Sequence, residues 1–93
     1  MGQGEQHDLG RAVAACARAV LVLRERPRSA AVAREISGAS SAVADLPAGL
    51  ATESLYRLLA AVEDCHRAGA PDSPQLGHRT RAVARLIRLS PAA

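Results

Sequence analysis

Apolar residues recur along the chain at spacings of three and four, which is the period of an amphipathic α-helix. In residues 9–26 and 29–46 the spacing is 4, 3, 4, 3, as in a heptad seam. The seam positions are Leu9, Val13, Cys16, Val20 and Leu23 in the first segment, and Val32, Ile36, Ala39, Val43 and Leu46 in the second.

The second half of the chain has two more segments of this kind, 51–68 and 74–90. Their apolar faces comprise Leu55, Leu58, Leu59, Val62 and Cys65 in the first, and Leu76, Thr80, Val83, Leu86, Ile87 and Leu89 in the second. The pairs Glu53–Arg57 and Glu63–Arg67 are placed to support the third helix.

Capping and breaking residues mark where each segment begins and ends. Asp8, Ser29 and Ser73 are the expected N-caps, and Pro74 suits the first helical position. The expected stops are Pro27, the turn Leu46-Pro47-Ala48-Gly49, Gly69 with Pro71, and Pro91. A break at Ile36-Ser37-Gly38 is the alternative to one continuous helix over 29–46.

Four helices joined by short turns predict an all-α, antiparallel (up-down-up-down) four-helix bundle. Residues 9–90 form its single helical domain, after a flexible tail at 1–8 and before a short tail at 91–93.

The composition predicts a thin core. The 93 residues include 21 Ala, 20 Val, Ile or Leu, and one aromatic residue, Tyr56. Small cores of this kind are often completed by oligomerisation. All twelve basic residues are Arg, which with the alanine content indicates a GC-rich bacterial genome. The chain has no secretion signal and no apolar run long enough for a membrane span, so the cytoplasm is the expected location.

The segment 9–26 is apolar beyond its seam at Leu21 and Val22. One explanation is that this helix is central and contacts two neighbours. The other is an interface with a second chain, since two large aliphatic side chains left in water would each forgo about 1.5–3 kcal/mol. The expected interface residues are Ala14, Ala17, Arg18, Leu21 and Val22.

The outward face of 29–46 is made mostly of small residues: Arg34, Ser37, Gly38, Ser41 and Asp45. Gly38 and Ala42 are four apart, a spacing that permits close approach of another backbone. A plain solvated, serine-rich face is the alternative.

A row of basic residues lies opposite the apolar face of 74–90. It consists of His78, Arg81, Arg85 and Arg88, with no acidic residue between Arg81 and Arg85. A phosphate backbone or an acidic partner would match it, although no aromatic residues accompany it for base stacking.

The stretch 54–63, Ser-Leu-Tyr-Arg-Leu-Leu-Ala-Ala-Val-Glu, is similar to the third helix of winged-helix domains, and 27–33 is loosely similar to the helix before it. The resemblance implies a divergent helix-turn-helix that binds DNA. About ten extra residues separate the two pieces, and no β-rich wing follows.

Weak candidates for metal ligands are Cys65, His66 and His78, with Asp72 or Glu63 nearby, but their spacing matches no standard site. No nucleophile motif or phosphate-binding loop is present, so we expect no enzyme and no cofactor. The sequence therefore predicts a protein–protein interaction module, a homodimer or a subunit of a complex. A small DNA-binding regulator is the alternative.

Overall fold

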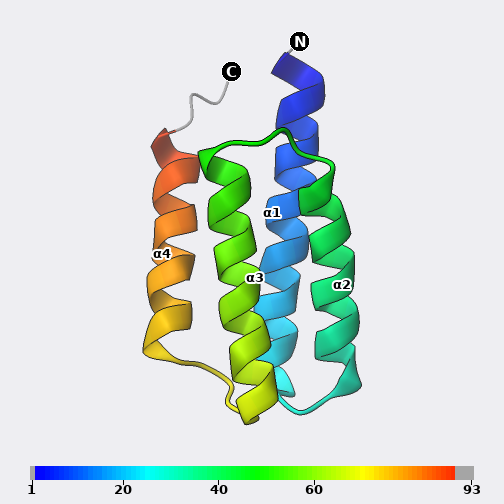
Figure 1. The fold of residues 1–93 in the computed structure, drawn as a ribbon, viewed down its shortest axis with the longest axis vertical. Helices are drawn as coiled ribbons and strands as arrows, with labels where there is room; N and C mark the ends of the chain where they lie inside the picture. Colours follow the sequence, from blue (N-terminus) through cyan, green and yellow to red (C-terminus); the bar gives the residue numbers. More distant parts are fainter. Residues whose placement is uncertain (1, 90–93) are drawn as a thin grey trace.

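A computed structural model describes the backbone of residues 2–89 and the side chains of residues 7–88. It contains four helices, α1 (Gly2–Glu25), α2 (Ala30–Ala44), α3 (Leu50–Ala68) and α4 (Pro74–Leu89), and no strand within the described residues. Successive helices run in opposite directions along a body of 40 × 23 × 19 Å (Figure 1). The prediction of an all-α antiparallel four-helix bundle is confirmed.

The helix bounds agree with the sequence pattern except at the start of α1. This helix begins at Gly2, well before the predicted start at Leu9, so Asp8 lies inside the helix and is not its N-cap. α2 runs without interruption through Gly38, and the alternative break there does not occur. Residue 90 and the predicted tail at 91–93 lie outside the described residues.

The predicted caps of α2, α3 and α4 form as expected. Ser29 Oγ accepts a hydrogen bond from the Ala31 backbone N–H at 3.1 Å, and Ser73 Oγ accepts one from Leu76 N–H at 3.0 Å. α3 ends at Gly69, whose φ of 67° is left-handed and therefore favours glycine. Local hydrogen bonds thus fix the starts of α2 and α4 and the end of α3.

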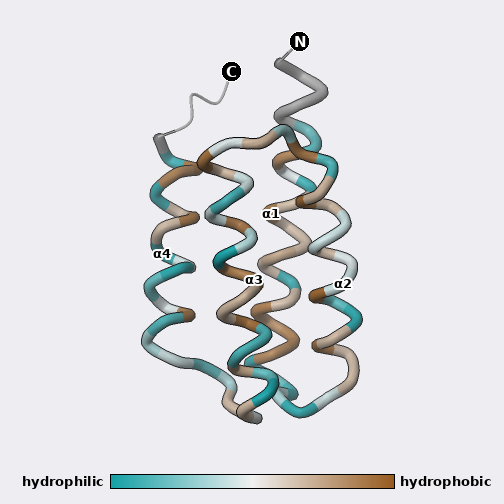
Figure 2. The backbone as a smooth tube through the Cα atoms, viewed as in Figure 1, coloured by the Kyte–Doolittle hydropathy of each residue, from teal (hydrophilic) through white to brown (hydrophobic). Residues whose placement is uncertain are grey.

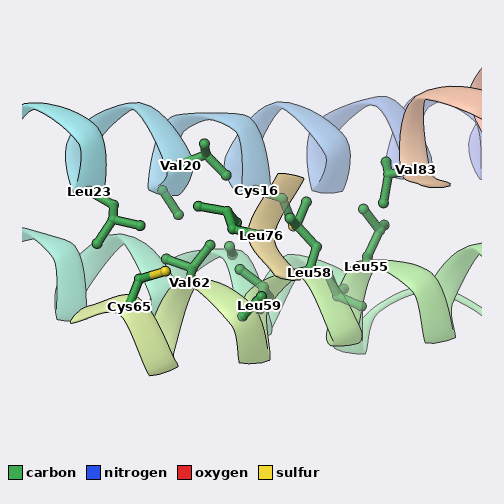
Figure 3. Packing of buried hydrophobic residues seen from close by; sticks show 14 of the residues in the cluster. Cys16, Val20, Leu23, Leu55, Leu58, Leu59, Val62, Cys65, Leu76 and Val83 are labelled. Atoms are coloured by element: carbon green, nitrogen blue, oxygen red, sulfur yellow. The ribbon is translucent and has the colours of Figure 1, made fainter. Parts of the chain in front are cut away.

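The core lies between α1 and α3 and is completed by one face each of α2 and α4 (Figure 3). All five predicted apolar positions of α3 are buried. The buried residues are Ala12, Cys16, Ala19, Val20 and Leu23 of α1; Val32, Ala39 and Val43 of α2; Leu55, Leu58, Leu59, Ala61, Val62 and Cys65 of α3; and Leu76 and Val83 of α4. Three alanines thus join the predicted seams.

α4 is the outermost helix of the bundle. Within the described range its backbone packs against α3 and approaches neither α1 nor α2 closely, while α1, α2 and α3 all contact one another (Figure 1). Side chains bridge the remaining gap between α4 and α1: Leu9 and Val13 face Val83 and Ile87 across a crevice of about 10 Å³. That volume is enough for about one water molecule, so the crevice holds no larger ligand.

Candidate interaction surfaces

Leu21 and Val22, the two residues that extend the apolar surface of α1 beyond its seam, differ in burial. Val22 is half-buried and packs against the core, as expected for a helix with neighbours on two sides. Leu21 remains 58% exposed. The central-helix explanation therefore accounts for Val22 and does not account for Leu21, whose side chain is mostly exposed.

A shallow groove runs between α1 and α2. It is lined mainly by small side chains: Ala14, Ala15, Gly38, Ala39 and Ala42, with Arg11, Arg18 and Glu35 at its rim. Arg18 Nε lies 3.7 Å from Glu35 Oε1, and this pair bridges the groove. Leu21 follows Arg18 by one helical turn on the outer side of α1.

Two features that the sequence suggested separately therefore meet on one surface. Two of the predicted α1 interface residues, Ala14 and Arg18, line one groove with the small pair Gly38 and Ala42 of α2. We name this surface the α1–α2 face and define it by the groove residues Ala14, Arg18, Gly38 and Ala42 together with the exposed Leu21, one turn beyond Arg18 on α1. Ala17 and Val22, the other two predicted interface residues, are not part of it.

Gly38 has no packing role in the described part of the chain. A Cβ atom added there would have no heavy atom within 4 Å beyond its own helical backbone. Glycine in the interior of a helix costs about 1 kcal/mol relative to alanine. α2 thus carries a destabilising residue, on the α1–α2 face, for which its own fold gives no reason.

Sequence reasoning missed three other exposed apolar side chains. Leu50 is 66% exposed, and Tyr56 and Ile87 are each 43% exposed. Tyr56 lies in an open depression on α3 lined by Thr52, Glu53, Arg57 and Ala60. The helical period could have identified Leu50 and Tyr56, because both fall off the seam of α3.

The basic row on α4 is exposed throughout: His78, Arg81, Arg85 and Arg88 all face solvent. Figure 2 shows α4 as largely hydrophilic, in contrast to the mostly apolar α1. Ion pairs in the described residues involve Arg18, Arg57 and Arg67, and none involves the α4 row. Arg67 pairs with Asp64 rather than with the predicted Glu63.

The three weak metal candidates have other roles in the fold or face solvent. The Cys65 thiol donates a hydrogen bond to Ser73 Oγ at 3.3 Å, and His66 Nδ1–H donates to the Pro27 carbonyl at 2.8 Å. His78 is exposed. Among the described residues no three His, Cys, Asp or Glu side chains are grouped to hold a metal ion.

Both cysteines are free and buried. Cys16 is 1% exposed, and desolvation by burial raises the pKa of its thiol to about 11. A thiol held in its neutral form behaves as a small apolar side chain, because the thiolate is the reactive species.

The fold agrees with the winged-helix resemblance only in part. The stretch 54–63 lies within α3, whose apolar side is buried in the core, and the described chain contains no strand that could form a wing.

None of the four helices, over the residues described, is both long and apolar enough to span a membrane. Comparison of the chain with protein-family models, with curated proteins and with solved structures finds no match.

Proposed function

We propose that this protein is a non-enzymatic helical interaction module, and that a second copy of the same chain docks on its α1–α2 face. The observation that carries the proposal is Gly38, a helix-interior glycine whose missing side chain leaves open space on the surface. A backbone approaching from outside would use that space. The exposed Leu21, farther along α1, supplies apolar area that such a contact would bury.

The α1–α2 face is complementary to itself, which favours a second copy over an unrelated partner. It offers an exposed side chain, Leu21 of α1, and a small-residue groove that begins one turn away at Arg18. A two-fold axis between the copies would place each Leu21 against the other copy's groove. The rim charges, Arg18 and Glu35, are of opposite sign and would also meet across such an axis.

The proposal includes a cytoplasmic setting. Two free, buried thiols suit a compartment in which cysteines stay reduced.

The first test compares two substitutions that remove an exposed leucine and add the same charge. Leu21→Glu lies in the α1–α2 face, and Leu50→Glu lies outside it. We expect light scattering over a concentration series to show a wild-type dimer, a folded Leu21→Glu monomer and an unaffected Leu50→Glu dimer. A wild-type chain that remains monomeric at millimolar concentration contradicts the proposal, as does equal weakening by the two variants.

The second test uses Gly38→Ala. Within the monomer the added methyl group meets nothing, so the free energy of unfolding should rise by about 1 kcal/mol in the Leu21→Glu background. Dimerisation of the otherwise wild-type chain should weaken, because the methyl group occupies the space of the partner backbone. The matched control is Gly77→Ala on α4, where the new Cβ would lie 3.4 Å from the flexible end of Arg81. It should leave dimerisation unchanged.

A further inference from the structure

Positive charge is concentrated in one helix. α4 contains four arginines, Arg79, Arg81, Arg85 and Arg88, and no acidic residue. The chain as a whole has twelve arginines and nine acidic residues, so the part outside α4 has eight and nine. The net charge of +3 therefore arises from α4 alone.

The fold holds this charge toward solvent. Leu76 and Val83 are buried and fix one side of α4 on the core, which leaves Arg81, Arg85 and Arg88 on the opposite side. In the described residues none of these three guanidinium groups has an ion-pair partner. Arg81 and Arg88 are seven residues apart in the sequence, which is about 10 Å along the helix. Like charges one turn apart repel each other, so the row gains nothing from the isolated fold.

A ligand for this row must present several negative charges at short, regular intervals. The phosphates of double-stranded DNA do so, with one charge per about 1.7 Å of helix axis over both strands. Aromatic side chains that would stack on unpaired bases are absent from α4, since Tyr56 lies on α3. Contacts to the backbone of a duplex therefore fit better than contacts to a single strand.

An anionic membrane surface fits this helix less well. Helices that lie on membranes insert a continuous apolar face beside their basic face. The apolar side of α4 is occupied by the core, and only Ile87 on it is substantially exposed among the residues described. We propose that Arg81, Arg85 and Arg88, with His78 at the end of the row, bind the phosphate backbone of duplex DNA without sequence preference. This site is independent of the α1–α2 face.

The test is fluorescence anisotropy of a labelled 20-base-pair duplex titrated with the whole protein at 50 to 200 mM NaCl. Three neutralised phosphates predict a slope of log K against log salt of about −2.7, which is roughly a 40-fold loss of affinity over this range. Each of Arg81→Gln, Arg85→Gln and Arg88→Gln should weaken binding and reduce the magnitude of the slope by about 0.9.

The matched controls are Arg57→Gln and Arg67→Gln, which remove the same charge from ion-paired positions on α3. Both should retain wild-type affinity if the α4 row is the site, and circular dichroism should show that all five variants are folded. Equal weakening by the α3 and α4 variants would overturn the proposal, because net charge alone would then explain binding. So would the absence of binding at 50 mM NaCl, or tighter binding to phosphatidylglycerol vesicles or polyglutamate than to the duplex.

Discussion

α3 and α4 are adjacent helices of similar amphipathic pattern, yet the fold uses them differently. α3 (Leu50–Ala68) buries six residues and contacts all three other helices. α4 (Pro74–Leu89) buries Leu76 and Val83 and packs its backbone on α3 alone within the described range. The two arginines of α3, Arg57 and Arg67, are ion-paired, and those of the α4 row are not.

The difference shows that helices of one small bundle can have different roles. In a helix with neighbours on several sides, most apolar side chains are buried and the surface charges are paired locally. A helix held by one side has the rest of its surface available for recognition. Burial and charge pairing on α3 therefore point to a structural role, and their scarcity on α4 points to a binding role.

The largest expected effects come from truncating one buried leucine in each helix. Leu55 is 1% exposed and Leu76 is 0% exposed, so replacement of either by alanine should cost about 2–5 kcal/mol of the free energy of unfolding. Leu55→Ala should weaken all four helices together. Leu76→Ala should release α4 first, because this helix has few other anchors.

Urea denaturation and native-state hydrogen exchange measure these two outcomes. In Leu76→Ala the backbone amides of α4 should lose protection while those of α1–α3 retain it. If α4 exchanges only through global unfolding in both variants, the two helices are equally anchored and the comparison fails.

A second prediction concerns the exclusion of water from the core around Cys16, near Leu58 and Leu76 (Figure 3). Burial raises the pKa of this thiol from an ordinary value of 9.0 to about 11, so above pH 9 the unfolded chain loses a proton that the fold retains. The unfolded state then binds fewer protons, and stability falls as pH rises from 9 to 11, by at most about 1.4 kcal/mol per pH unit.

The measurement is urea denaturation from pH 8 to 11 with Cys16→Ala as the control. The control should lack this part of the decline. In Leu76→Ala the decline should shrink, because water that enters beneath a released α4 restores the ordinary acidity of the thiol. Identical pH dependence in the wild type and Cys16→Ala would mean that the site is not dry.

Much of the fold follows from the period of the apolar residues. That period identified every buried position of α3 except Ala61, because alanine carries too weak a signal to mark a core position. It also assigned Ile87 to the core face of α4, where the side chain is 43% exposed. Periodicity shows which side of a helix is apolar but not how many neighbours cover that side.

The sequence indicated which residues of the candidate surfaces to consider, but not which of them are exposed or lie together in the fold. Leu21 and Val22 are adjacent and both apolar, and only the packing of the helices decides that Val22 is covered and Leu21 is not. The meeting of Gly38 with Ala14 and Arg18 in one groove likewise depends on tertiary packing. The α4 row needed no such information, because four residues of one helix share a face by geometry alone.

The smallest expected effect separates the arginines of α3 from those of α4. Arg57 pairs with Glu53 across one turn, with both side chains 56% exposed, so Arg57→Gln should cost about 0.3–0.5 kcal/mol at low salt. Arg85→Gln removes a like-charge neighbour of Arg81 and should stabilise the fold by a few tenths of a kcal/mol. Thermal unfolding at 20 mM NaCl should show opposite signs, and 1 M NaCl should remove both effects because the charges are exposed. A loss of stability in Arg85→Gln at low salt would show that Arg85 already has a partner within the fold. A loss of stability in Arg57→Gln without a loss in Arg85→Gln would show that the arginines of α4 do not stabilise the fold.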